Sequence, residues 1–244
     1  MHDNIGCRRI LLEGADNVRD LGGFCTIYGN VTKFCRLVRS EELSGLTTKD
    51  FSTLYDYGIR NCIDLRSNLQ IQNYPSKLVN DTRFEYFTIN VDTSFSEKNG
   101  TIMYSSEFKD SDWIGILYGI LNNQKEWIAE VMKTFLKCSG GVIFNCNTGR
   151  NRSNIVAMLI LLVSGVPSID IIAEYATNEV YLKQKYCKWD GGGKKYSSGY
   201  YKTSSFVMDA VIEKLLINYG TVEKYLCNCG LSIQEVQKIG AILI

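Results

Sequence analysis

Hydrophobic residues in the first two thirds of the chain predict three strands. The run Ile59–Leu65 consists mostly of apolar residues, which is typical of an internal strand. Residues 87–91 alternate between apolar and polar side chains, which predicts a second strand that ends at Asp92. Val142–Phe144 predicts a third, short and buried strand.

Segments with a helical period lie between and after these strands. Thr47 or Thr48 is placed to cap a helix that ends near Gly58. Apolar residues recur every three to four positions over residues 127–136, which predicts a second helix. Residues 93–112 are polar and irregular, and we expect no regular element there.

Alternation of strands and helices of these lengths implies crossover connections and parallel strand pairing. We therefore expect an α/β fold with a mostly parallel central sheet flanked by helices. Beyond Val166 the pattern is entirely helical, so residues 167–244 are expected to form a C-terminal helical cap. Since no repeat or low-complexity linker interrupts the chain, residues 1–244 are expected to form one domain.

The charge and histidine content exclude several classes of function. The 244 residues carry a formal net charge of +1, so we expect no nucleic-acid partner held by bulk charge. The single histidine is His2, next to the terminus, which excludes Ser-His-Asp and Cys-His catalysis and zinc sites built on histidine. The longest apolar run, Ile155–Val163, is much shorter than the roughly 20 residues of a bilayer span, so no integral membrane segment is expected.

The nine cysteines suggest a reducing environment. Their number is odd, they form no Cys-x-x-Cys pair, and Met1–Ala15 lacks the apolar centre of a secretory signal. We expect free thiols and a cytoplasmic location.

Lys183–Lys202 contains six lysines and a single acidic residue, Asp190. One interpretation is a solvated loop between two helices. The other is a cationic lip that faces a lipid head group or a phosphopeptide.

Cys146 and Arg152 are the ends of a Cys-x5-Arg segment that lies between a short apolar strand and a long apolar helix. Gly149 lets the loop between them curl tightly. This layout directs consecutive backbone N–H groups and a helix N-terminus at one point above the sulfur. Such a cradle binds a phosphate dianion and lowers the pKa of the thiol, so the cysteine becomes a nucleophile without a histidine base.

The side chains of the segment suit phosphoryl transfer. The planar guanidinium of Arg152 can bind two phosphoryl oxygens at once, and Ser153 can donate a hydrogen bond to the sulfur when it leaves. The phosphate is expected to contact Asn147, Thr148, Gly149, Arg150 and Asn151. The structural alternative is a buried cysteine capped by an arginine.

Other motifs accompany the loop along nearly the whole chain: Asn17–Gly23, Arg39–Leu46, Ile59–Ser67, residues 165–178 and Tyr219–Tyr225. Together with the loop they resemble the cysteine-dependent protein-tyrosine-phosphatase superfamily. The resemblance is to its bacterial tyrosine-phosphatase-like branch, whose members include dual- and triple-specificity enzymes acting on phosphoproteins and phosphoinositides. It implies the phosphatase fold and a phosphocysteine mechanism without metal or cofactor.

The loop departs from the family pattern at two places. Asn145 replaces the usual histidine before the nucleophile, and Arg150-Asn151 replaces a Lys-Asp pair. We expect Asn145 to hydrogen-bond loop carbonyls, so that the thiolate still forms. Asn151 cannot donate a proton as an aspartic acid would, so another carboxyl group must protonate the leaving oxygen.

Two aspartates at predicted strand ends are candidates for this general acid. Asp64 is favoured slightly because it belongs to the Asp-Leu-Arg motif of the family, but it can equally be an ion-pair partner of Arg66 or Arg19. Asp92 occupies the place where related enzymes carry an acid loop, but it can equally cap a turn.

These residues predict a phosphatase in which Cys146 attacks phosphorus, Arg152 stabilises the transition state and water cleaves the phosphocysteine. Expected substrates are phosphotyrosine, phosphoserine or phosphothreonine, and phosphoinositides, because Arg150 and the lysine-rich segment would suit several anions. One alternative is a phosphate-binding pseudophosphatase disabled by Asn145 and Asn151. Another, a rhodanese-like sulfurtransferase, is disfavoured by the Arg152-Ser153 ending. No oligomeric state is predicted.

Overall fold

A five-stranded sheet is the centre of the computed structural model, which describes residues 7–91, 109–188 and 203–244. The strand order is β1-β2-β5-β3-β4. β1 pairs antiparallel with β2, and all other neighbours are parallel, so the mostly parallel α/β sheet is confirmed. The strands are β1 (Arg19–Asp20), β2 (Leu37–Ser40), β3 (Ile59–Asp64), β4 (Glu85–Thr88) and β5 (Gly141–Asn145).

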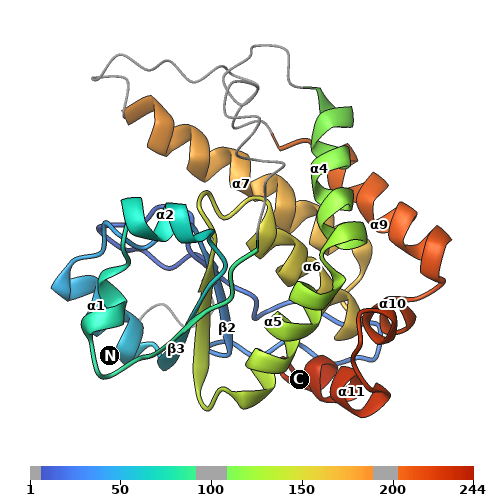
Figure 1. Ribbon diagram of the computed structural model, residues 1–244, viewed down its shortest axis with the longest axis horizontal. Coiled ribbons are helices and arrows are strands. Elements are labelled where there is room, and N and C mark those ends of the chain that lie inside the picture. The colour runs from blue at the N-terminus through green and yellow to red at the C-terminus, as the bar shows by residue number, and fades with distance from the viewer. Residues whose placement is uncertain (1–6, 92–108, 189–202) are drawn as a thin grey trace.

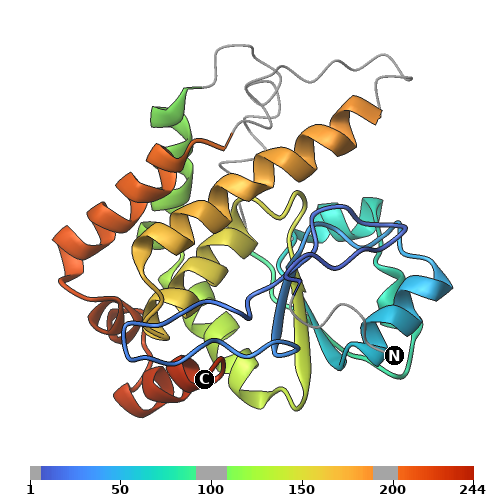
Figure 2. The same ribbon diagram turned by 180° about the vertical axis from the view of Figure 1, so that it is seen from behind.

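Helices cover both faces of the sheet (Figures 1 and 2). α1 (Thr48–Asp56) and the 3-10 helix η1 (Lys77–Asn80) cover one face, and α2 (Asn68–Asn73) follows β3. The other face carries α4 (Asp110–Asn123), α5 (Lys125–Lys137), α6 (Arg152–Val163), α7 (Ser168–Lys188), α9 (Ser205–Tyr219), α10 (Val222–Asn228) and α11 (Ile233–Ala241).

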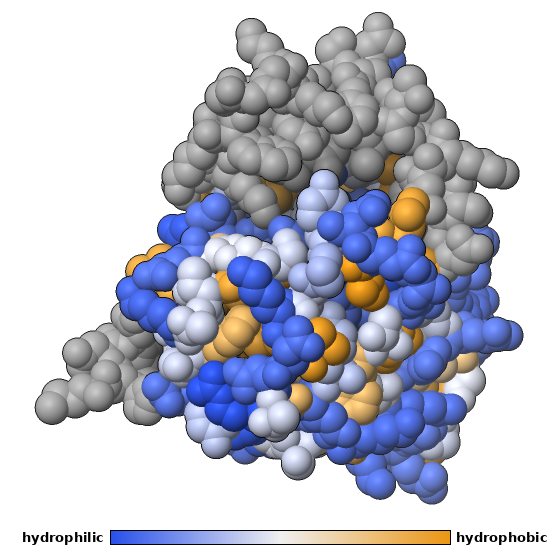
Figure 3. Space-filling view, turned by 60° about the vertical axis from the view of Figure 1, so that its left-hand side comes forward, coloured by the Kyte–Doolittle hydropathy of each residue, from blue (hydrophilic) through white to orange (hydrophobic). Residues whose placement is uncertain are grey.

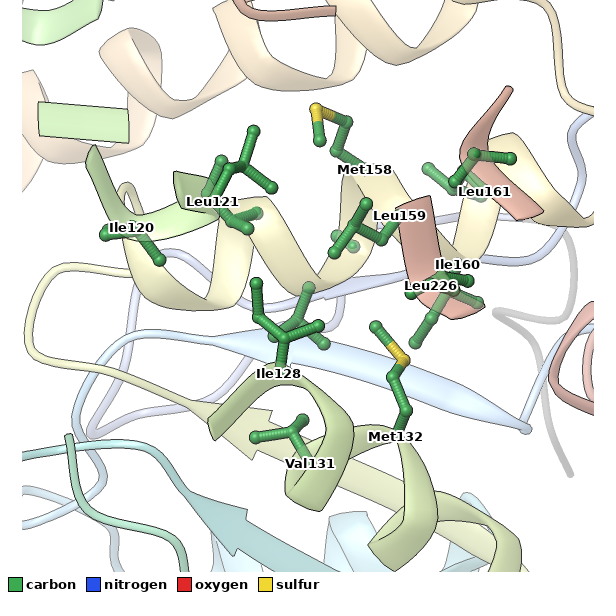
Figure 4. Packing of buried hydrophobic residues seen from close by; sticks show 14 of the residues in the cluster. Ile120, Leu121, Ile128, Val131, Met132, Met158, Leu159, Ile160, Leu161 and Leu226 are labelled. Carbon is green, nitrogen blue, oxygen red and sulfur yellow. The ribbon is translucent and has the colours of Figure 1, made fainter. Parts of the chain in front are cut away.

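The two faces have separate hydrophobic cores, and β5 contributes to both. Val142 and Phe144 belong to the larger core and Ile143 to the smaller, as the alternation of side chains along a strand requires. In the larger core, apolar side chains of α4, α5, α6 and α10 meet (Figure 4). Residues 152–161 of α6 are all buried, which explains why this helix is apolar on every side.

Helix α1 confirms the predicted cap. Thr47 is the N-cap residue, and it forms a capping box with Asp50. Gly58 follows the helix with a φ of 99°, the left-handed conformation that favours glycine.

Helix α4 was not predicted, and its first turn lies within the stretch expected to be irregular. Gly115 and Gly119 weaken its local helical preference. Trp113, Leu117 and Leu121 are nevertheless buried in the larger core, so packing against α6 and α9 stabilises the helix.

Strand β4 lies earlier in the chain than the alternation predicted, because its pairing with β3 ends at Thr88. Ile89 and Val91 are buried beyond the strand, so the alternating pattern marked burial in the core rather than strand pairing. Asp92, where the second strand was expected to end, lies outside the described residues.

The chain beyond Val166 is helical in its described part, as predicted. These C-terminal helices pack against α4, α5 and α6, and of these three α6 contacts strands β2 and β5. Among the described residues, no helix has both the length and the apolar character needed to cross a membrane. The described part of the face in Figure 3 is mostly hydrophilic, with apolar residues in small groups.

Candidate active site

Cys146 follows β5 directly, at the carboxyl edge of the parallel strands, and α6 begins at Arg152. Ligands of α/β proteins bind at this edge of the sheet. The strand, loop and helix therefore have the arrangement that the sequence predicts for residues 142–163. Cys146 is only 2% exposed.

Three consecutive carbonyl groups of the loop are held from outside by donors of distant segments. The backbone N–H of Glu42 donates to Asn147 O at 3.1 Å, and the amide Nδ2 of Asn17 donates to Thr148 O at 2.9 Å. The next carbonyl, Gly149 O, accepts a hydrogen bond from Nη2 of Arg39.

These bonds fix the direction of the loop N–H groups. In a trans peptide the C=O and N–H point in opposite directions, so carbonyls turned outward place the N–H groups of Thr148, Gly149 and Arg150 on the inner side. The Gly149 N–H is among the donors that lower the pKa of Cys146. The loop is thus a nest of N–H groups around the sulfur.

Gly149 is required by this arrangement. Its φ is +73°, and a Cβ atom at this position would lie 2.8 Å from Nδ2 of Asn17. A larger residue would be strained and would displace the donor that holds Thr148 O.

Arg152 is buried, and the segment after β3 holds its side chain. Nη1 donates to Leu65 O and Nη2 donates to Oε1 of Gln70, both at 2.8 Å. The same Gln70 oxygen accepts a bond from Ser67 N in the capping box of α2. Sequence reasoning missed Gln70, although the Ser-x-x-Gln spacing is that of a capping box.

The environment of Cys146 favours the thiolate. Burial raises the pKa of this thiol, but the charge of Arg152 and hydrogen bonds from Ser153 and from the Gly149 N–H lower it, and the net direction is downward. Ser153 Oγ lies 3.3 Å from the sulfur. Cys62 is buried too, and burial leaves its pKa well above the ordinary value.

Asp64 is enclosed in an ion pair. Its Oδ2 accepts from Nη2 of Arg66 at 2.6 Å and from the Tyr86 hydroxyl at 2.5 Å, and its Oδ1 accepts from Nε of Arg66 at 2.9 Å. The residue is 0% exposed. The structure thus contains the ion pair with Arg66 that the sequence left open as the alternative to a catalytic role for Asp64.

Asn145 has a different partner from the expected loop carbonyls. Its Nδ2 donates to Oδ1 of Asp64 at 3.3 Å, and its backbone carbonyl accepts from Leu65 N. Strand register explains this partner. Asn145 of β5 is paired with Asp64 of β3, and side chains of paired residues on neighbouring strands lie side by side.

Arg150 was expected to help bind a substrate with several anions, but its side chain is buried. It is 1% exposed, and its guanidinium lies 3.6 Å from the ring centroid of Trp113 in the first turn of α4. Helix α4, which the sequence did not predict, covers it. Asn151 is the N-cap residue of α6 and makes no side-chain capping bond.

The described residues therefore bring together Cys146, Arg152, Ser153 and the backbone of the loop. Asp92 and most of Lys183–Lys202 lie outside the described residues, so their predicted roles stay predictions.

Comparisons with known proteins bear on the family of this chain. A family model described as "Tyrosine phosphatase family" matches residues 10–244. A tyrosine-protein phosphatase of Nostoc commune is 28% identical over 213 residues, which cover 83% of this chain and 72% of that protein. Among solved structures, TpbA of P. aeruginosa aligns at 11% identity with a TM-score of 0.37, over 84% of this chain and 86% of that one. Since the family model spans almost the whole chain, the protein belongs to the tyrosine phosphatase family.

Proposed function

We propose that this phosphatase hydrolyses phosphotyrosine and related phosphomonoesters through a phosphocysteine intermediate on Cys146. The observation that carries the proposal is the orientation of the loop, whose carbonyls are bonded outward and whose N–H groups face the sulfur. A dianion bound there meets several donors and a helix N-terminus. The lowered pKa of the thiol adds a nucleophile at the same point.

In the first step the thiolate of Cys146 attacks phosphorus. An S–P bond forms, the P–O bond to the leaving group breaks, and the electron pair stays on the leaving oxygen, which takes a proton from a general acid. The guanidinium of Arg152 and the loop N–H groups stabilise the equatorial oxygens.

In the second step a water molecule attacks phosphorus, one of its protons passes to the carboxylate left by the first step, and the S–P bond breaks. Inorganic phosphate is released and the sulfur leaves as a thiolate. The hydroxyl of Ser153, 3.3 Å from the sulfur, is placed to donate a hydrogen bond to that thiolate.

We assign the general acid to Asp92 rather than to Asp64. The chain reaches Asp92 just after the buried residues Ile89 and Val91, which follow β4 at the carboxyl edge of the sheet. Asp64, in contrast, is enclosed by Arg66 and Tyr86.

Among substrates, we propose phosphotyrosine first and treat phosphoserine, phosphothreonine and phosphoinositides as further candidates. The burial of Arg150 removes one argument for a substrate with several anions. The lysines of residues 183–202 remain the reason to test phosphoinositides.

Hydrolysis of an activated aryl phosphate tests the proposal, because its good leaving group needs little help from an acid. We expect turnover that vanadate inhibits and that Cys146→Ser abolishes. Binding of vanadate without any turnover by the parent protein would instead indicate a phosphate-binding pseudophosphatase. A panel of phosphotyrosine and phosphoserine peptides and phosphoinositides then ranks the substrates.

A further inference from the structure

A buried polar network lies behind the loop, on the side away from the sulfur. Two arginines share one carboxylate oxygen in it: Arg19 Nε lies 2.7 Å and Arg39 Nη1 lies 3.2 Å from Oε1 of Glu174. All three side chains are at most 2% exposed. With two guanidinium groups and one carboxylate, these three side chains carry an excess of positive charge in a region of low dielectric.

Two members of the network contact the loop itself. Arg39 donates to Gly149 O through Nη2 and to Oδ1 of Asn154 in α6, at 2.5 Å, through Nη1. Asn17 donates to Thr148 O at 2.9 Å and accepts a bond from Arg19. A single guanidinium therefore spans the loop, the helix after it and the carboxylate of α7.

We propose that Arg39 and Asn17 are positioning residues: they hold the loop in its anion-binding form, and Arg39 adds a buried positive charge behind the nucleophile. The inference rests on the proposed function of Cys146 and adds to it residues of the N-terminal segment. The C=O and N–H of a trans peptide point in opposite directions. Each carbonyl that Arg39 or Asn17 holds outward therefore turns the N–H of the same peptide inward, toward the sulfur.

The electrostatics agree with this role. Burial and the neighbouring Arg19 lower the pKa of Arg39, whereas Glu174 and the Cys146 thiolate raise it, so the guanidinium and the sulfur are coupled. Other charged residues lie in or beside the loop: Arg150 within it, Arg152 at the start of α6, Asp64 at the end of β3 with Arg66 bound to it, and Glu41 and Glu42 after β2. Of these, Arg152 lowers the pKa of Cys146.

The test measures the thiolate rather than activity alone. The pKa of Cys146 is obtained from the pH dependence of iodoacetate alkylation, followed by mass spectrometry of the peptide that contains this residue. Arg39→Met removes the charge and the donor and leaves Glu174 paired with Arg19. We expect the pKa of the thiol to rise by about one unit, and kcat/KM for an aryl phosphate to fall at least about tenfold.

Glu174→Gln distinguishes an effect of charge on the thiol from an effect on folding. The amide keeps an oxygen that can accept from Arg19 and Arg39 but removes the negative charge, so the pKa of Cys146 should fall in this variant. Asn17→Asp exchanges the donor to Thr148 O for an acceptor, so the pKa should rise. Arg60→Met, which alters an arginine bonded to Tyr55 O near the other end of β3, is the control and should leave the pKa unchanged.

A residue that only supports folding would lower the amount of folded protein without moving the pKa in the fraction that remains. Thermal unfolding of each variant shows that fraction. If the pKa of Cys146 shifts in neither Arg39→Met nor Glu174→Gln, or shifts in the same direction in both, the inference is overturned. If the pKa of Cys146 shifts as expected in Arg39→Met and Glu174→Gln but the parent protein hydrolyses no phosphate ester, the proposed function fails while this inference stands.

Discussion

Gln70 accepts a hydrogen bond of 2.8 Å from Nη2 of Arg152, across 82 positions of the chain. The same side-chain oxygen accepts from Ser67 N and so caps helix α2. A helix cap thereby fixes one edge of the guanidinium that is placed to bind phosphoryl oxygens. Leu65 O fixes a second N–H group of this guanidinium.

Gln70→Ala should therefore lower kcat/KM for an aryl phosphate by about tenfold, since a guanidinium that has lost one anchor spends less time in the geometry for bidentate binding. Steady-state kinetics with an aryl phosphate measure this effect. Gln72→Ala, in the exposed part of the same helix, is the matched control and should behave like the parent. Equal kinetics for both variants would show that the contact with Arg152 does not matter.

Substrates with poor and good leaving groups distinguish which of Asp92 and Asp64 is the general acid. Asp92→Asn should reduce hydrolysis of an alkyl phosphate by about 10² to 10⁴-fold and that of an activated aryl phosphate far less, because only the poor leaving group needs a proton. Parallel kinetics on the two substrates measure the ratio. If Asp92→Asn lowers both rates by the same factor, Asp92 is not the general acid.

Asp64→Asn should act on stability instead. It removes the nearer carboxylate of the buried guanidinium of Arg66 and leaves only Glu42, whose Oε2 lies 3.8 Å from Nη1, and the loss of a buried ion-pair partner costs about 3–5 kcal/mol. Thermal unfolding should show a clear loss, and the activity of the folded fraction should fall equally on alkyl and aryl substrates. Selective loss of alkyl phosphate hydrolysis would return the acid role to Asp64.

Arg150 gives a prediction opposite to that of an exposed rim charge. Because the guanidinium is buried against Trp113, Arg150→Ala should change hydrolysis of a phosphoinositide and of an aryl phosphate by the same factor. It should also lower the melting temperature, since α4 loses a contact with the loop. Assays at two salt concentrations complete the test. A larger, salt-sensitive loss for the phosphoinositide would place Arg150 in contact with the substrate.

The sequence predicted the parts of the fold that carry a strong local signal. The buried strand β3, the capped helix α1, and the strand, loop and helix around Cys146 have clear periods, caps or spacings. Strands β1 and β2 have two and four residues, which is too short for a period to be visible. Helix α4 contains two glycines and forms because Trp113 and Leu117 pack in the core, which is a tertiary effect.

In the candidate site, too, local sequence patterns were predictive and tertiary contacts were not. The roles expected of Cys146 and Arg152 followed from the Cys-x5-Arg spacing together with the strand before the loop, Gly149 within it and the helix after it. The partners of Asn145 and Arg150 did not, because strand register brings Asp64 to the first and helix packing brings Trp113 to the second. The ion pair of Asp64 with Arg66 was one of two roles that the sequence left open. Gln70 belongs between these groups, since its capping box was visible while its contact with Arg152 was not.

The thiol of Cys146 should be ionised at lower pH than an ordinary thiol, whose pKa is about 8.5. Its alkylation rate should therefore rise with pH through a midpoint below that value, while Cys62 stays unreactive over the same range because burial raises its pKa. Ser153→Ala removes a donor to the thiolate, so the midpoint should move to higher pH. A midpoint for Cys146 at or above that of a model thiol would contradict the cradle described above.

Trapping the covalent intermediate tests the central claim most directly. The protein is mixed with a phosphotyrosine peptide, quenched in acid within the first turnover, digested and analysed by mass spectrometry, with Cys146→Ser in parallel. We predict one phosphoryl group on the peptide that contains Cys146 in the parent protein and none in the variant. Rapid release of phosphate with no phosphorylated Cys146 peptide at any quench time, or turnover by Cys146→Ser within tenfold of the parent, would contradict the account.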